Sequence, residues 1–268
     1  MNKILSVNGI KKVYGNDTQA LKGVSFDVYE GEFVVIIGLS GSGKSTLLRC
    51  INRLVKQTEG SIEFQGIKLE NSNKKELRNS RREIGMIFQH YNLIDRLTVI
   101  QNVLHGRLGY MSNFHGIFDL YSQDDRRRAL QILERVGLEN EVLKRADQLS
   151  GGQKQRVAIS RALAQNPSLM LADEPIASLD PVSSDVVMDY LHNICKEDGI
   201  SAIVSLHQVE FALKYATRII GIRDGFIVYD GKPENLSDEM VSEIYKKNGS
   251  QNVTNDQGKH EFKNAVAI

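Results

Sequence analysis

A glycine-rich segment followed by a lysine and a serine is the clearest sign of chemistry in this chain. Residues 38–45, GLSGSGKS, match the pattern G-x-x-x-x-G-K-[ST], in which small residues let backbone N–H groups point at bound phosphates. Lys44 would reach the β- and γ-phosphates, Ser45 would bind Mg²⁺, and Thr46 would bind the α-phosphate. The alternative is a glycine-rich turn without a nucleotide, which the apolar run before the segment and the helical pattern after it disfavour. The predicted binding residues of this phosphate loop are Gly38, Ser40, Gly41, Ser42, Gly43, Lys44, Ser45 and Thr46.

Two carboxylates and a histidine follow two other apolar runs. Asp173 and Glu174 come directly after residues 169–172, and His207 comes directly after residues 203–206. Because the carboxyl ends of parallel strands meet at one edge of a sheet, these side chains should lie near the phosphate loop. Asp173 would hold the metal ion, Glu174 would orient and deprotonate an attacking water, and His207 would contact the terminal phosphate. Taken alone, the acidic pair is equally compatible with an exposed turn, and a lone histidine is usually structural.

The elements that must position these side chains alternate between strands and helices. Four short, continuous apolar runs have the composition of strands that are buried on both faces of a parallel sheet. They lie at residues 33–37, 84–88, 169–172 and 202–206. Helical patterns such as 44–54 and 155–164 occur between them, so the predicted fold class is α/β with a mainly parallel central sheet.

The flanking segments predict smaller structural units around this sheet. Val24, Phe26 and Val28 alternate with polar residues, which favours a half-buried antiparallel strand, and Asp224-Gly225 lies between two apolar runs as in a hairpin. Residues 92–149 have mostly helical patterns. We therefore expect one domain over residues 1–246, with an N-terminal antiparallel β subdomain and a helical subdomain inserted at about 91–160, followed by a polar, flexible tail at 247–268.

Composition narrows the possible classes of protein. The 268 residues carry a formal net charge of +1, whereas a dedicated nucleic-acid binder usually has a marked basic excess. Cys50 and Cys195, the two cysteines, are far apart and predict buried thiols in a reducing compartment, not a disulfide or metal site. The N-terminus has no apolar signal sequence, and the longest clean apolar run is too short to cross a bilayer. Any role at a membrane should therefore come through a partner.

A second motif carries a resemblance to a known family. Residues 149–153, LSGGQ, here called the signature segment, match the signature of ATP-binding-cassette (ABC) ATPases, and the resemblance extends to about Tyr245. It implies a P-loop NTPase (RecA-like) core that binds ATP and Mg²⁺. It also implies a homodimer in which the signature segment of one copy closes over the ATP held by the phosphate loop of the other. The signature residues implied to bind the γ-phosphate of the opposite copy are Ser150, Gly151, Gly152 and Gln153.

Three further site residues are assigned through this resemblance. Tyr14 resembles the aromatic residue that stacks on adenine, although its position also suits a tyrosine on an edge strand. Gln89 resembles the glutamine that contacts Mg²⁺ and signals to a membrane partner. Asp180 resembles the acidic residue that crosses to the second subunit.

Finer resemblance suggests which ABC subunits are most similar. Residues 91–99 and 102–103 look like importer subunits, in which this surface receives a helix of a membrane permease, although internal packing explains any single apolar residue of this stretch about equally well. Residues 172–181 and 206–213 resemble phosphonate importers. The implied partners are a permease and, indirectly, a solute-binding protein, with the chain on the cytoplasmic face of the membrane. The alternatives are an importer subunit for another solute such as an amino acid, a non-transport ABC ATPase, and a phosphate-loop kinase, in which LSGGQ would have no role.

Overall fold

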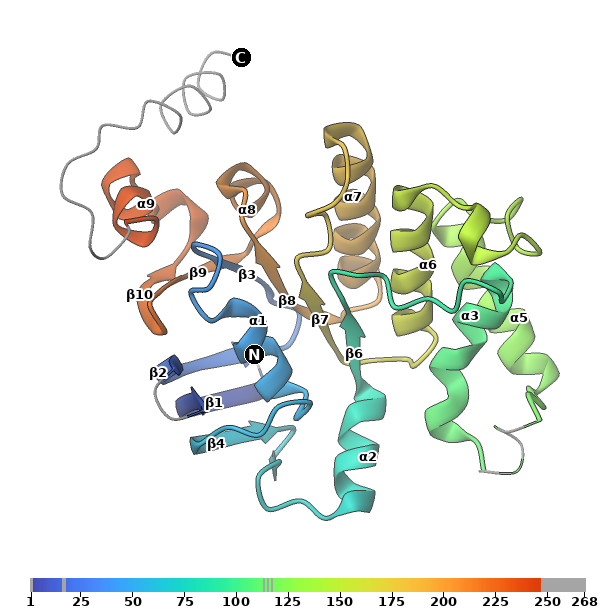
Figure 1. Ribbon diagram of the computed structural model, residues 1–268, viewed down its shortest axis with the longest axis horizontal. Helices are drawn as coiled ribbons and strands as arrows, with labels where there is room; N and C mark the ends of the chain where they lie inside the picture. Colours follow the sequence, from blue (N-terminus) through green and yellow to red (C-terminus); the bar gives the residue numbers. More distant parts are fainter. Residues whose placement is uncertain (1, 16–17, 113, 115, 117, 247–268) are drawn as a thin grey trace.

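A six-stranded sheet forms the centre of the computed structural model, which describes residues 2–15, 18–112, 114, 116 and 118–246 (Figure 1). In the order in which they lie across the sheet, the strands are β10 (Phe226–Gly231), β9 (Arg218–Arg223), β3 (Phe33–Ile37), β8 (Ser201–Leu206), β7 (Leu169–Asp173) and β6 (Ile84–Ile87). All neighbouring pairs are parallel except β10 with β9. The predicted mainly parallel sheet, built from the four apolar runs, is confirmed.

A second, antiparallel sheet of four strands comes mainly from the N-terminal part of the chain. Its strands, in spatial order, are β2 (Thr18–Tyr29), β1 (Lys3–Tyr14), β4 (Glu59–Phe64) and β5 (Ile67–Lys68). Val24, Phe26 and Val28 of β2 are buried, and the residues between them are not, as the alternating pattern predicts.

The two faces of the central sheet contribute to different hydrophobic cores. Phe33, Val35 and Ile37 of β3 belong to a cluster shared with the helices, whereas Val34 and Ile36 belong to a cluster shared with the antiparallel sheet. Since side chains alternate between the faces of a strand, a strand covered on both sides must be apolar throughout. Because the strands are apolar along their whole length, the polar residues begin only where the strands end, at the carboxyl edge of the sheet.

Helices cover the central sheet and extend beyond its β6 edge (Figure 1). The α-helices whose bounds lie within the described residues are α1 (Lys44–Ile51), α2 (Lys74–Glu83), α3 (Val99–Leu104), α5 (Gln123–Arg135), α6 (Gly151–Leu163), α7 (Pro181–Glu197), α8 (Val209–Tyr215) and α9 (Asp238–Ile244). The 3-10 helices are η1 (His105–Tyr110), η2 (Ala146–Gln148) and η3 (Pro233–Asn235). Compared with the predicted helical patterns, α1 ends at Ile51 and not Leu54, and α6 begins earlier, because Ser150 caps its first turn.

The stretch predicted to be a helical insertion packs together beside β6. Between residues 92 and 149, the described part of the chain forms α3, η1, α5 and η2, with an isolated bridge between Thr98 and Arg145 as its only β pairing. α3, α5 and α6 contact one another and form a layer at one side of the molecule (Figure 1). The division into subdomains stays a prediction, and the expected tail at 247–268 lies outside the described residues.

Two smaller expectations concern the hairpin and the membrane. Asp224 and Gly225 join β9 to β10 with φ angles of 50° and 83°, and positive φ at both central residues is the geometry of a tight hairpin turn. Within the described ranges, we find no helix with both the length and the apolar composition needed to cross a bilayer.

Candidate functional site

The phosphate loop lies between the end of β3 and the start of α1, where neighbouring backbone leaves no room for side chains. A Cβ atom at Gly38 would lie 2.1 Å from the carbonyl oxygen of Ile222, and one at Gly43 would lie 2.5 Å from that of Ala20. Both glycines also have positive φ, at 150° and 111°. Glycine is therefore required at these two positions, and the loop backbone is the surface that a ligand would meet.

Lys44 is almost fully buried at the centre of this loop. Its Nζ donates to the carbonyl oxygens of Gly38 and Leu39 at 2.8 and 3.1 Å, and lies 3.7 Å from Oε1 of Glu174. Burial lowers the pKa of Lys44, while the charges of Glu174 and Asp173 act in the opposite direction. A buried ammonium bound by carbonyls of its own loop can exchange these bonds for stronger ones to phosphate oxygens.

Glu174 and His207 meet Lys44 at the carboxyl edge of the sheet. Nε2 of His207 lies 2.6 Å from Oε1 of Glu174, and its Nδ1 lies 3.5 Å from Nζ of Lys44. Glu174 has a φ of 50°, in the left-handed region that few residues other than glycine adopt. The structure thus brings together three predicted site residues that are far apart in the sequence.

Asp173, by contrast, is held by two residues that the sequence analysis missed. Its Oδ1 accepts a hydrogen bond from the Ser205 hydroxyl at 3.2 Å, and its Oδ2 lies 3.3 Å from Nη2 of Arg49. The same hydroxyl accepts the Glu174 N–H at 3.0 Å, so Ser205 fixes both acidic residues. A polar residue inside the apolar run of β8 was the available signal for Ser205, whereas nothing local indicated Arg49.

The signature segment forms the N-terminus of α6, with Ser150 exposed and Leu149 buried, and this helix stands well apart from α1 in Figure 1. Ser150 Oγ accepts the N–H of Gln153 at 3.3 Å, and Gln153 Oε1 accepts the N–H of Ser150 at 2.9 Å, which makes a capping box. A Cβ atom at Gly151 would lie 3.0 Å from the Tyr91 hydroxyl oxygen. The segment is therefore packed against other parts of its own chain but is not joined to its own phosphate loop by any hydrogen bond of the described residues.

The three residues assigned through resemblance lie at separate points of the surface. Tyr14 ends β1 with its side chain about 40% exposed, and Nζ of Lys12 lies 4.8 Å from the centre of its ring. Gln89 follows β6 and is half-buried. Asp180 caps α7 by accepting the N–H of Ser183 at 2.9 Å, and hydrogen bonds from Ser183 hold its pKa below the usual value. Their predicted roles stay predictions.

Comparison with known protein families identifies the family to which this chain belongs. The sequence model of the ABC transporter family matches residues 21–177, which is more than half of the chain. This chain belongs to the ABC transporter family.

Full-length relatives and solved structures extend the match to almost the whole chain. The Phosphonates import ATP-binding protein PhnC 2 of Halalkalibacterium halodurans is 56% identical, over 91% of this chain and 100% of the relative. The PhnC protein of Treponema denticola is 49% identical, over 89% and 93%. The dimeric post-hydrolysis structure of the ATP-binding cassette MJ0796 with ADP and Pi has a TM-score of 0.76 and 38% identity, over 86% of this chain and 99% of the other. The ATP-binding cassette MJ1267 has a TM-score of 0.80 and 32% identity, over 92% and 100%.

The site of this ABC family member fits a magnesium nucleotide. Within the loop, the hydroxyl oxygen of Ser42 is buried and has no hydrogen-bond partner among the described residues, and a phosphate oxygen would provide one. The predicted metal ligands Ser45, Gln89 and Asp173 can each bind through a side-chain oxygen atom, the kind of ligand that Mg²⁺ prefers. No cluster of three or more His, Cys, Asp or Glu side chains in the described ranges could hold a metal by itself.

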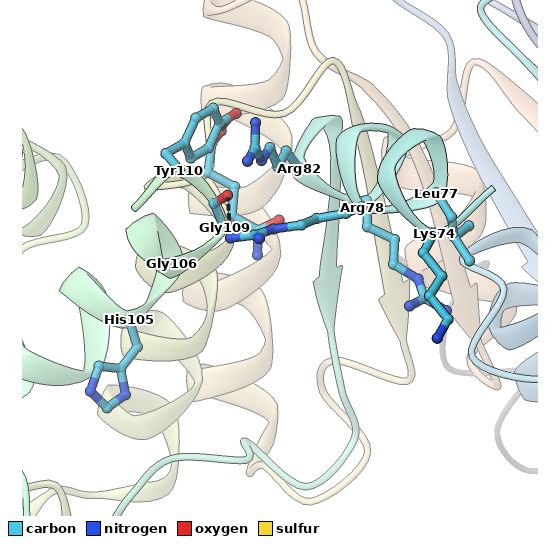
Figure 2. A pocket seen from close by; sticks show the side chains of 10 residues that line it. Lys74, Leu77, Arg78, Arg82, His105, Gly106, Gly109 and Tyr110 are labelled. Carbon is cyan, nitrogen blue, oxygen red and sulfur yellow. Dashed lines mark hydrogen bonds between the residues drawn. The ribbon is translucent and has the colours of Figure 1, made fainter. Parts of the chain in front are cut away.

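A pocket of about 440 Å³ lies between α2 and η1, beside the helical layer (Figure 2). Four of its ten lining residues are Lys or Arg and none is acidic, so we call it the basic pocket; its lining is Lys74, Leu77, Arg78, Arg81, Arg82, His105, Gly106, Gly109, Tyr110 and Gln165. The surface expected to receive a permease helix is only partly available, because Val99, Asn102 and Val103 are buried. Asn102 instead holds the preceding turn, since its amide bonds the backbone of Ile94 in both directions. At these buried positions, internal packing is the correct interpretation.

Proposed function

We propose that this chain is the ATP-hydrolysing subunit of an ABC importer that takes up phosphonates or related oxyanions through a membrane permease. The observation that carries the proposal is the meeting of Lys44, Glu174 and His207 at one edge of the sheet, directly beside a phosphate loop. In one place, Lys44 supplies a cation that can bind phosphates, Glu174 supplies a carboxylate base, and His207 supplies a group that can orient this carboxylate.

In the proposed reaction, the phosphate loop and Lys44 bind the ATP phosphates. Nζ of Lys44 exchanges the carbonyls of Gly38 and Leu39 for oxygens of the β- and γ-phosphates. Glu174 accepts a proton from the water that attacks the γ-phosphate, and His207, at 2.6 Å, keeps the carboxylate aimed at that water. When bound, Mg²⁺ neutralises charge on the phosphates and orients them. Asp173 would hold that ion, and Ser205 and Arg49 fix the orientation of its buried carboxylate.

The proposed working unit is a homodimer with two composite sites. The exposed N-terminus of α6 presents the N–H groups of Gly151 and Gly152 and the Ser150 hydroxyl, which are suited to an anion. A second copy, related by a two-fold axis, would supply the phosphate loop and the ATP that these groups contact. The dimeric form of the relative MJ0796 supports this arrangement. ATP would close the dimer, and loss of the γ-phosphate would let it reopen.

Placement at the cytoplasmic face of a membrane follows from the proposed partner. The pocket between α2 and η1, of about 440 Å³ and with Lys and Arg but no acidic side chain in its lining, is the surface that we propose receives a helix of the permease (Figure 2). Phosphonate as the transported class is supported by the names of the relatives and by the resemblance of residues 172–181, because this chain itself would not touch the solute.

Reconstitution tests the transported class. The chain would be combined with its permease and solute-binding protein in lipid nanodiscs, and ATP hydrolysis measured with phosphonate, phosphite, phosphate or an amino acid. We expect phosphonate or a related oxyanion to stimulate hydrolysis most. Stimulation by the amino acid alone would contradict the substrate assignment while leaving the ATPase assignment intact.

A further inference from the structure

Arg161, on α6, is a half-buried charge whose hydrogen-bond partners are both backbone carbonyls. Its Nη2 donates to the carbonyl oxygen of Tyr91 at 2.9 Å, and its Nη1 donates to that of Asn92. Burial lowers the pKa of this guanidinium, and it forms no ion pair with a carboxylate of the described chain. The guanidinium is therefore held only by the carbonyls of one turn, which it ties to α6.

The two carbonyls belong to the turn that follows Gln89. Asn92 has a φ of 51°, in the left-handed region, which asparagine adopts more readily than other residues with a side chain, so the chain reverses direction here. The same turn also reaches the other end of α6, because the Tyr91 hydroxyl packs against Gly151, where an added Cβ would lie 3.0 Å away. The turn is thus attached to α6 at two points, one in its first turn and one ten residues later, roughly 15 Å along the helix axis.

The C-terminal end of α6 carries one wall of the basic pocket. A Cβ atom at Gly106 would lie only 2.2 Å from the carbonyl oxygen of Arg161, so η1 is in direct backbone contact with the helix. Arg107 donates to the carbonyl oxygen of Ala164 at 3.2 Å, and the Tyr110 hydroxyl to that of Gln165 at 2.7 Å. Gly106 and Tyr110 both line the pocket (Figure 2). Whatever binds in the pocket therefore presses on a segment that is fixed to α6.

We infer that Arg161 is a positioning residue that makes α6 a single rigid link between the pocket, the Gln89 turn and the signature segment. The inference rests on the proposed function, in which a permease helix occupies the pocket. When η1 moves, the movement is passed to the C-terminal end of α6, which η1 contacts. From there, Arg161 passes the movement to the turn beside Gln89, while the helix itself carries it to Ser150 and so to the nucleotide of the second copy. Without Arg161, the turn and the helix move independently.

A matched pair of variants on the same helix tests this inference. Arg156 also donates from its guanidinium to two consecutive carbonyls, those of Val136 at 2.7 Å and Gly137 at 3.2 Å, but these lie after α5 and away from the Gln89 turn. Arg161→Met and Arg156→Met would be compared for melting temperature, for basal ATP hydrolysis by the isolated chain, and for hydrolysis stimulated by permease and loaded binding protein.

We expect both variants to lower the melting temperature, but only Arg161→Met to weaken the stimulation of ATP hydrolysis by the permease. Arg161→Met should reduce the ratio of stimulated to basal hydrolysis by about tenfold, with basal hydrolysis within about twofold of the parent. Arg156→Met should leave that ratio unchanged. Arg161→Lys should recover part of it, because an ammonium keeps the charge and can donate to a carbonyl but lacks the planar, two-nitrogen fork with which Arg161 binds the turn. Equal uncoupling by both Met variants, or equal loss of basal and stimulated rates in Arg161→Met, would overturn the inference.

Hydrogen exchange on the isolated chain separates this inference from the proposed function. Amides of residues 89–94 should exchange faster in Arg161→Met than in the parent or in Arg156→Met, because the turn has lost its anchor. Unchanged exchange there overturns the role of Arg161. If the permease does not stimulate ATP hydrolysis by the parent protein, the proposed function is contradicted instead. The role of Arg161 is then decided by the hydrogen-exchange result alone.

Discussion

The phosphate loop with its strand-edge residues and the signature segment are two halves of a predicted site, and they differ in how complete they are. Around Lys44, Asp173 and Glu174, most polar groups already have partners within the chain and are buried or half-buried. At the N-terminus of α6, Ser150 is exposed, and its capping box holds the helix end in shape while the first backbone N–H groups point outward. One half is assembled in a single chain, whereas the other becomes useful only when a second chain supplies an anion. Substitutions in the two halves should therefore fail in different ways.

Lys44→Ala should have the largest effect, because it removes the cation of the assembled half. ATP binding and hydrolysis should both fall, with hydrolysis reduced by at least about 10²–10³-fold. Binding of a fluorescent ATP analogue and release of phosphate would be measured together, with the exposed Lys56→Ala as a control. Normal turnover in Lys44→Ala would show that residues 38–45 are not the phosphate site.

Glu174→Gln should separate the two halves within one protein. The amide cannot accept the proton of the attacking water, so hydrolysis should fall by about 10²–10⁴-fold while ATP still binds. Because the γ-phosphate persists, the dimer should stay closed, which size-exclusion chromatography with light scattering would detect. Glu139→Gln, at an exposed position, is the control. A Glu174→Gln protein that stays monomeric with ATP would contradict the composite site.

Ser150→Arg should disable the incomplete half alone. The long side chain blocks the approach of the second copy, so hydrolysis should fall about 10²-fold whereas the dissociation constant for ATP on the chain's own loop changes little. Ser122 is a matched control, since it caps α5 in the same way through the N–H of Asp125 at 3.0 Å. Ser122→Arg should cost helix stability only. If Ser150→Arg weakened ATP binding by the monomer, the two halves would not be independent.

Ser205→Ala should have the smallest effect on ATP hydrolysis of the four substitutions. It tests whether Ser205 belongs to the assembled half of the site. Loss of the hydroxyl leaves the Glu174 N–H and an oxygen of Asp173 without a partner, at a cost of about 1–3 kcal/mol in the free energy of unfolding. Ser201, on the same strand, is equally buried and likewise accepts a backbone N–H, that of Gly31 at 3.0 Å. Chemical denaturation should show similar losses for Ser205→Ala and Ser201→Ala, with a fall in ATP hydrolysis only for Ser205→Ala. Equal activity in both variants would remove Ser205 from the site.

The sequence alone determined the features that depend on neighbouring residues. Continuous apolar runs predicted the buried strands, and the residues that end them predicted the edge at which Lys44, Glu174 and His207 meet. The glycines of residues 38–45 could be recognised because their spacing is local. The turn at Asp224-Gly225 was equally visible, since positive φ at both positions is a property of those two residues.

Only the tertiary structure decided the contacts between segments that are distant in the sequence. Arg49 and Asp173 are 124 residues apart, and no local pattern links them. Val99 and Val103 looked equally suited to a docking surface and to packing, and their burial settled the question. The attachment of the Gln89 turn to α6 through Arg161 likewise spans 70 residues. Periodicity along a chain predicts which face of an element is buried, but which residue lies opposite is fixed only when the elements pack together.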